Sequence, residues 1–197
     1  MKDQFDYLGL PSPIRKELAK SFYAEHGYPT PEELRSVVEK CWHLTYREYK
    51  YFAMELMARM KKKAGHDAIF LYEKLITDGS WWDTIDHLAP VLVGYHFQEY
   101  PEERGKYLNK WIASDNIWLQ RSCILFQLKY KSDTDTRLLS SIIIELKDSK
   151  EFFIRKAIGW ILREYSKTDP GFVIRFVQNH DLSGLSHREA LKWLERQ

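Results

Sequence analysis

The sequence predicts an all-α fold, and three observations support this prediction. Helix-start signals recur along the chain, three of them Ser, Thr or Asp directly before Pro, with apolar residues at helical spacing between them. No segment shows the sustained apolar–polar alternation of a half-buried strand. Aromatic residues head four helices at intervals of 36, 36 and 35 residues, at Tyr46, Trp82, Trp118 and Phe153. Together these patterns predict an α-solenoid of HEAT-like helical repeats, which presents its inner helices along a concave surface.

Capping residues set the expected ends of the helices. Ser12 and Thr30 each precede a proline at the first helical position, and Gly27 stops the first helix. Ser80 is expected to cap the helix that begins with two tryptophans. The expected helices cover residues 12–26, 30–42, 45–63, 67–77, 80–96, 101–113, 116–129, 134–147 and 150–166, and Asp169 and Ser186 open a final pair. Because the loops are short, neighbouring helices should pack antiparallel, and residues 1–197 are expected to form one domain.

Composition indicates a soluble protein. Of the 197 residues, 44% are hydrophobic and 29% charged, as in ordinary globular domains. No apolar run approaches eighteen residues and the N-terminus resembles no signal peptide, so we expect a cytoplasmic protein without a membrane partner. Cys41 and Cys123 stand far apart, which argues against a disulfide framework or a structural zinc site.

Charge is distributed unevenly although the net charge is only +2. Residues 78–115 contain three Lys or Arg against seven Asp or Glu, whereas residues 116–167 contain ten against six. Such a division suits a polyanion bound along one side of the molecule. Solvated helix faces are the commoner explanation, and both remain open on charge alone.

The repeat register brings four residues into one stripe. Asp86 follows Trp82 by one helical turn, and in the same register Arg121 and Trp160 occupy the matching face of the next two repeats. An aromatic plane beside a carboxylate suits a flat, cationic ligand. The alternative places both tryptophans in the core and pairs Asp86 with Arg121 as a salt bridge between repeats.

Four segments carry a resemblance to a known family. Residues 80–86 read SWWDTID, residues 110–121 KWIASDNIWLQR, residues 125–131 LFQLKYK and residues 150–160 KEFFIRKAIGW. These segments closely resemble the AlkD family of bacterial DNA glycosylases, and the resemblance covers nearly the whole chain. It implies HEAT-like repeats around duplex DNA and base excision repair of cationic N3- and N7-alkylated purines, such as 3-methyladenine and 7-methylguanine. It further implies no cofactor and no metal, and excision from the duplex without base flipping.

The resemblance also assigns roles. The family's catalytic carboxylate falls on Asp86, its two active-site tryptophans on Trp82 and Trp160, and the arginine that holds the DNA backbone beside the lesion on Arg121. The chemistry suits these residue types, because a carboxylate can stabilise the oxocarbenium-like sugar that forms as a cationic purine departs. From the basic part of the chain, Lys129, Lys131, Lys156 and Arg163 are candidate contacts to DNA phosphates, although each equally fits a solvated surface position.

One departure from the family and two alternatives stand beside this interpretation. Relatives usually carry a further helix or two before the segment that matches residues 6–10, and Pro11 stands where a polar residue is expected. We expect a monomer that binds double-stranded DNA containing alkylated purines. The alternatives are a non-catalytic family member that binds DNA, and a HEAT-type protein-binding scaffold.

Overall fold

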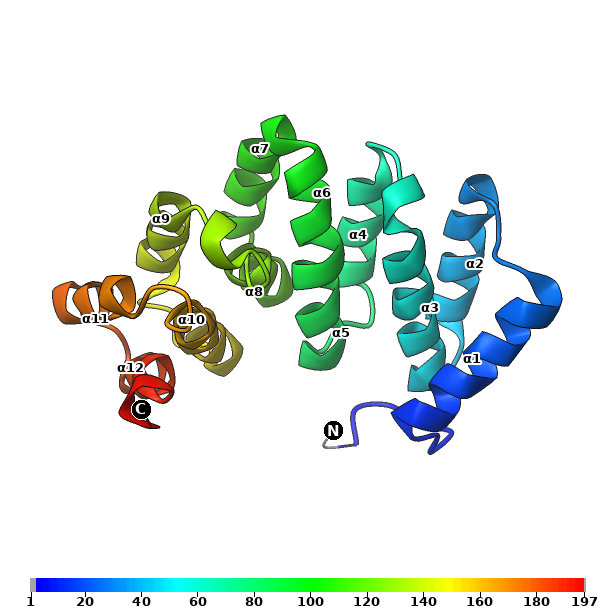
Figure 1. Ribbon diagram of the computed structural model, residues 1–197, viewed down its shortest axis with the longest axis horizontal. Coiled ribbons are helices and arrows are strands. Elements are labelled where there is room, and N and C mark those ends of the chain that lie inside the picture. The colour runs from blue at the N-terminus through cyan, green and yellow to red at the C-terminus, as the bar shows by residue number, and fades with distance from the viewer. Residues whose placement is uncertain (1–2, 197) are drawn as a thin grey trace. The chain divides into compact units, whose positions relative to one another are not determined.

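The computed structural model describes residues 3–196, and all regular secondary structure in this range is helical (Figure 1). The all-α prediction is confirmed, and the helices pair and stack as successive repeats, as in an α-solenoid. The chain divides into two compact units, the first ending at Leu71 and the second beginning at Tyr72. Each unit is described separately below.

The first unit contains three long helices and a short basic turn. These are α1 (Ser12–His26), α2 (Pro31–His43), α3 (Arg47–Met60) and the 3-10 turn η1 (Lys61–Lys63). Helix α4 (Ala68–Thr77) continues into the second unit. The predicted start of α2 is confirmed: Thr30 Oγ1 accepts from the Glu33 backbone N–H at 3.3 Å, and the Glu33 carboxylate accepts from the Thr30 N–H at 2.9 Å. This reciprocal capping box fixes the first turn.

The segment before α1 is held by the first turn of α3. The buried Glu48 carboxylate accepts the backbone N–H groups of Leu8, Gly9 and Leu10 at 3.0, 3.0 and 3.2 Å. Gly9 has a φ of 77°, a left-handed conformation that a residue with a Cβ rarely adopts. Burial raises the pKa of Glu48, but these hydrogen bonds outweigh it and hold the pKa below its usual range. The carboxylate therefore stays charged and organises this segment.

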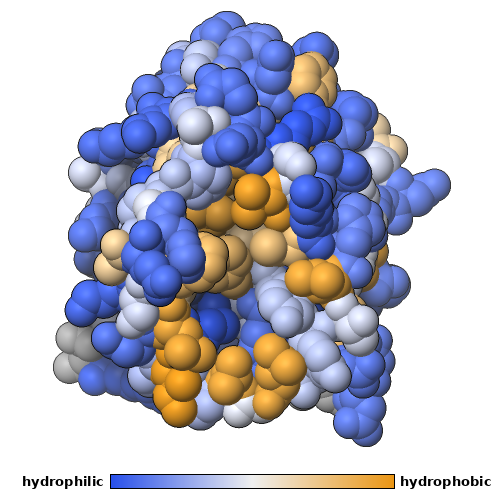
Figure 2. Space-filling view, turned by 90° about the vertical axis from the view of Figure 1, so that its right-hand side faces the viewer, coloured by the Kyte–Doolittle hydropathy of each residue, from blue (hydrophilic) through white to orange (hydrophobic). Residues whose placement is uncertain are grey.

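Helix α1 has two apolar faces. Ala19 and Tyr23 are buried, whereas Ile14, Leu18 and Phe22, spaced four residues apart, are exposed. Figure 2 views the side of the molecule that carries α1 and α2, and shows apolar patches set in a largely hydrophilic surface. The exposed stripe thus lies outside the core of its unit.

The second unit stacks helices from successive repeats. Its elements are α5 (Trp82–His87), η2 (Leu88–Val93), α6 (Gly94–Glu99), α7 (Pro101–Ile112), α8 (Ile117–Leu125), η3 (Lys131–Asp133), α9 (Thr136–Leu146), α10 (Phe152–Tyr165), α11 (Pro170–Asn179), α12 (Gly184–Leu191) and η4 (Leu194–Arg196). Helix α8 packs against α5 and η2 on one side and against α10 on the other, and α12 covers α10 (Figure 1). The core includes Phe97, Trp111 and Phe126, with the rings of Phe97 and Phe126 edge to face. This stacking brings consecutive repeats side by side.

The helix that starts at Trp82 is not a regular α-helix. Its middle turn, η2, is π-helical, and the helix continues through α6 to Glu99. Pro90 lies in this turn and has no N–H to donate to the carbonyl of Asp86, four residues earlier. Widening of the helix to the π form accommodates the proline without a break, a form often found at functional sites. The irregular turn therefore begins at Leu88, two residues after Asp86.

Several predicted helix ends were wrong, for local reasons. Ser80 does not cap the tryptophan helix, because its hydroxyl donates to the Ile76 carbonyl at the end of α4 and Trp81 takes the capping position. The last helix is capped by Ser183 rather than opened by Ser186, since Ser183 Oγ accepts from the Ser186 N–H at 3.2 Å. Helix α8 ends at Leu125, four residues short of the expected Lys129. At Ser80 and Ser183, a serine hydroxyl forms a backbone hydrogen bond that the sequence pattern did not predict. After Leu125, the chain forms a turn where a further helical turn was expected.

Candidate active site

The four residues predicted from the repeat register line one pocket in the second unit. Trp82 and Asp86 come from α5, Arg121 from α8 and Trp160 from α10, and the pocket has a volume of about 280 Å³. Trp82 is 40% exposed, which places its ring at the surface rather than in the core. The convergence of these residues is therefore a property of the stacked repeats.

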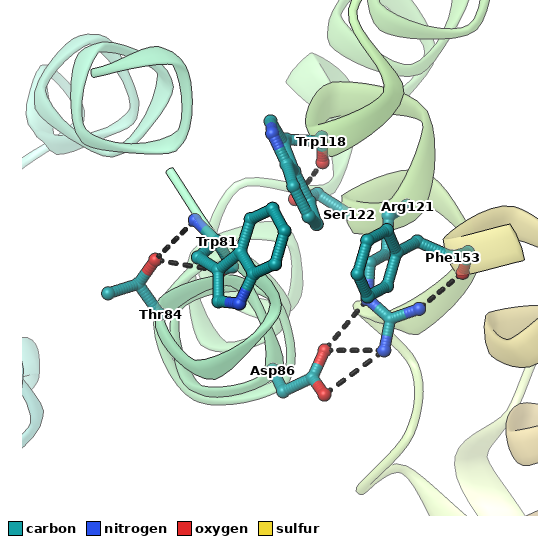
Figure 3. A network of polar contacts seen from close by, with 7 residues as sticks. All are labelled: Trp81, Thr84, Asp86, Trp118, Arg121, Ser122 and Phe153. Carbon is teal, nitrogen blue, oxygen red and sulfur yellow. Dashed lines mark hydrogen bonds and ion pairs between the residues drawn. The ribbon is translucent and has the colours of Figure 1, made fainter. Parts of the chain in front are cut away.

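Asp86 and Arg121 form a bidentate ion pair. Arg121 Nε donates to Asp86 Oδ1 at 2.8 Å and Nη2 donates to Oδ2 at 3.0 Å, while Nη1 donates to the Phe153 carbonyl (Figure 3). The Arg121 side chain is 5% exposed and that of Asp86 is 19% exposed. The salt bridge between Asp86 and Arg121, which the alternative interpretation also predicts, is therefore present. It forms part of the wall of a pocket that exposed and half-buried aromatic rings also line. Its geometry fixes the orientation of the carboxylate.

Burial and pairing act in opposite directions on this pair. Burial raises the pKa of the Asp86 carboxyl above its ordinary value, and the neighbouring Arg121 guanidinium opposes the rise without cancelling it. Burial likewise lowers the pKa of Arg121, and Asp86 opposes that change. Because an arginine side chain remains protonated in proteins, the pair consists of a fixed cation and a carboxylate that titrates at a higher pH than an exposed aspartate.

An aromatic cluster supports the ion pair. The ring centroid of Trp81, which caps the start of α5, lies 5.7 Å from that of Trp118 and 5.3 Å from that of Phe153 (Figure 3). The centroids of Trp118 and Phe153 are 5.0 Å apart. Trp81, rather than Trp82, therefore packs with the aromatic residues at the heads of the next two repeats. Trp82 is left free to face the pocket beside Asp86.

The four residues predicted to contact DNA phosphates line two different pockets, two residues in each. Lys156 and Arg163 line the pocket with Asp86, and their side chains are 35% and 28% exposed. Lys129 and Lys131 line a different pocket of about 450 Å³, to which α10 also contributes residues. Lys131 has a φ of 54°, a left-handed conformation that is strained for a residue with a Cβ. Both lysines are exposed.

Three residues that line the pocket were not predicted from the sequence as site residues: Phe152, Phe153 and Glu189. Glu189 lies on α12, and a signal for it existed in Gly159, next to Trp160 within α10. A Cβ on Gly159 would stand 2.4 Å from Glu189 Cβ and 2.9 Å from the Ser186 carbonyl. A glycine inside a helix indicates the close approach of another element, which here is α12.

Gly159→Ala is expected to destabilise the protein by about 1–3 kcal/mol, because the added methyl group overlaps α12 and forces the two helices apart. Urea denaturation followed by circular dichroism measures this change. Gly105→Ala is the matched control, since no atom beyond the surrounding backbone of α7 lies within 4 Å of the Cβ it would add, and it should leave stability unchanged or raise it by about 0.5 kcal/mol. Equal stability of the two variants would contradict the close contact.

Two further findings concern the described part of the chain. Within residues 3–196, no group of three or more His, Cys, Asp and Glu side chains is arranged to hold a metal ion. In the same range, no helix is both long and apolar enough to cross a membrane.

Comparison with known proteins places the chain in a family. Residues 1–194 match the family model of the DNA alkylation repair enzymes. A predicted DNA alkylation repair enzyme from Enterococcus faecalis has a similar structure, with a TM-score of 0.89 and 32% sequence identity over 100% of this chain and 92% of that chain. AlkD2 from Streptococcus mutans shares the fold, with a TM-score of 0.67 and 17% identity over 99% of this chain and 93% of that chain. No curated protein sequence gives a significant match. By the family match and the structural likeness over its whole length, the chain belongs to the DNA alkylation repair enzyme family.

Proposed function

We propose that the protein is a DNA glycosylase that hydrolyses the N-glycosidic bond of cationic N3- and N7-alkylated purines in duplex DNA. The observation that carries this proposal is the convergence of Asp86, Arg121, Trp82 and Trp160 in one pocket. Membership of the DNA alkylation repair family supports it. A protein-binding scaffold has no need to bring a buried ion pair together with two accessible tryptophans.

Asp86 is the catalytic carboxylate in this proposal. Alkylation at N7 or N3 gives the purine a positive charge and makes it a good leaving group, so the base needs little acid assistance. As the bond breaks, positive charge moves to the deoxyribose in an oxocarbenium-like transition state. The ionised Asp86 stabilises that charge and orients the attacking water, while the faces of Trp82 and Trp160 contribute cation–π attraction to the sugar.

Even without DNA, Arg121 positions the Asp86 carboxylate. Its guanidinium already makes two bonds to Asp86 and one to the Phe153 carbonyl, which leaves only two of its N–H groups. It therefore fixes the direction of the carboxylate and favours its ionised form. The remaining N–H groups are those that a backbone phosphate beside the lesion would use.

Duplex DNA is expected to meet the cations of both pockets. In this proposal, Lys156 and Arg163, which line the same pocket as Asp86, contact phosphates next to the lesion, and Lys129 and Lys131, which line the second pocket, contact phosphates farther from it. Because such contacts release counterions, affinity should fall steeply with salt. With the base left in the duplex, the pocket has to hold only the deoxyribose and its flanking phosphates.

The raised pKa of Asp86 predicts an acid limit to activity. Only the ionised carboxylate stabilises the cationic sugar, so activity is lost as the pH falls through the pKa of Asp86. Because burial raises that pKa, the loss should occur at a higher pH than the titration of an exposed aspartate. Single-turnover rates of 7-methylguanine release at a series of pH values measure the midpoint. A rate that stays constant down to the range of an exposed aspartate would count against this role.

Release of free base from a duplex with a single 7-methylguanine separates the three candidate functions. The proposed glycosylase binds the duplex and releases the base above the spontaneous rate. A non-catalytic family member binds without release, and a scaffold does neither. Chromatography of the free base and a gel-shift assay on the same duplex give both readouts.

A further inference from the structure

A second carboxylate in the pocket has no part in the chemistry proposed above. Glu189 Oε1 lies 3.0 Å from Lys156 Nζ, and Oε2 lies 2.5 Å from Arg163 Nη1. The Glu189 side chain is 14% exposed, and Lys192 Nζ stands 4.0 Å from Oε1. One acidic residue thus pairs with two of the cations that line the pocket.

Packing fixes Glu189 in this position. Helix α12 approaches α10 closely at Gly159, and Ser186 Oγ donates to the Arg155 carbonyl of α10 at 3.0 Å. Ser183 caps the start of α12. Although burial raises the pKa of Glu189, Lys156 and Arg163 hold it below its usual range, so the residue is charged at neutral pH. Glu189 is therefore a fixed negative charge.

The negative charge of Glu189 lowers the net positive charge of the pocket. Two carboxylates, Asp86 and Glu189, stand among three cations, Arg121, Lys156 and Arg163. Without Glu189, the excess positive charge would double from one to two. Electrostatic interactions are stronger where water is partly excluded, so a more positive pocket attracts phosphates of any DNA and repels a cationic nucleotide.

We propose that Glu189 is a specificity-determining residue, which pairs with Lys156 and Arg163 and so lowers the attraction of the pocket for undamaged DNA while favouring a cationic nucleotide. The inference rests on the proposed function for the nature of the favoured ligand. Both cations keep N–H groups that Glu189 does not occupy and are about one-third exposed, so they still contact a phosphate while paired. Glu189 limits these contacts without preventing them.

Binding of undamaged duplex DNA by Glu189→Gln tests the inference. The variant should bind several-fold more tightly than wild type at about 0.1 M salt, and the plot of log affinity against log salt should steepen by about one. Its rate of 7-methylguanine release per bound complex should fall several-fold, because a favourable negative charge is lost near the cationic sugar. Affinity and rate therefore change in opposite directions.

Two further variants make the result specific. Glu145→Gln removes the same charge from an exposed position on α9, away from the pocket, and should leave both affinity and rate near wild type. Glu189→Asp keeps the charge and should retain the discrimination of wild type. A variant that only damages the fold loses DNA binding and does not gain it.

The outcomes separate this inference from the proposed function. If Glu189→Gln binds undamaged DNA no more tightly than Glu145→Gln, the role of Glu189 is refuted, whatever the activity of wild type. If wild type releases no base but Glu189→Gln binds more tightly with a steeper salt dependence, the glycosylase proposal fails and the charge role of Glu189 stands.

Discussion

Asp86→Asn is expected to lower the rate of 7-methylguanine release by about 100-fold or more, the range found when one preorganised electrostatic group is removed from an active site. The amide keeps the size of the carboxylate but not its charge, so the cationic sugar loses its main stabilising partner. Its oxygen still accepts a hydrogen bond from Arg121, and the fold should persist. Single-turnover release with protein in excess over DNA measures the chemical step.

Asp83→Asn provides the matched control. It removes the same charge from the first turn of the same helix, at a residue that does not line the pocket. Its rate should stay within a few-fold of wild type. If the two variants release base equally fast, the pocket depends on overall charge and Asp86 has no catalytic role.

Arg121→Ala is expected to cost about 3 kcal/mol of stability, because it leaves the mostly buried carboxylate of Asp86 without its partner. The Phe153 carbonyl also loses its donor. The pKa of Asp86 should rise further, since the Arg121 cation opposes the effect of burial. Chemical denaturation measures the stability, and the pH profile of the remaining activity measures the pKa.

Two further variants serve as controls for Arg121→Ala. Arg121→Lys keeps the charge but cannot make the bidentate contact, so it should recover part of the stability and move the acid limit back toward that of wild type. Arg155→Ala removes an arginine from α10 that is partly exposed and donates to the Ser149 carbonyl, and it should cost much less. A stability loss in Arg121→Ala no larger than that of Arg155→Ala would contradict the buried-pair account.

The repeat register predicted the pocket because it follows from helix periodicity. Asp86, Arg121 and Trp160 lie within helices, where sequence spacing determines the face that a side chain occupies. Trp81 lies just outside α5 with an extended backbone, φ −154° and ψ 165°, so helical spacing says nothing about its direction. Its contact with Trp118 therefore emerges only from the structure.

Long-range packing accounts for the other missed features. Glu189 reaches the pocket because α12 folds back onto α10. Gly159 indicates that some element approaches α10 closely at this point, but the pattern within the helix does not say which element it is. The π-helical turn that contains Pro90 shows the same limit, since the pattern predicted a regular helix through this region. Capping was predictable where a side chain had only one partner within reach, as at Thr30, and failed at Ser80, whose hydroxyl binds the preceding helix.

Release of 7-methylguanine by the wild-type protein from a duplex that contains one such base tests the proposed glycosylase activity directly. The free base is measured against the same duplex without protein, and against a duplex with the uncharged analogue 7-methyl-7-deazaguanine. The proposed glycosylase should release 7-methylguanine well above the spontaneous rate and none of the uncharged analogue. Release of 7-methylguanine no faster than in the absence of protein would contradict this proposal.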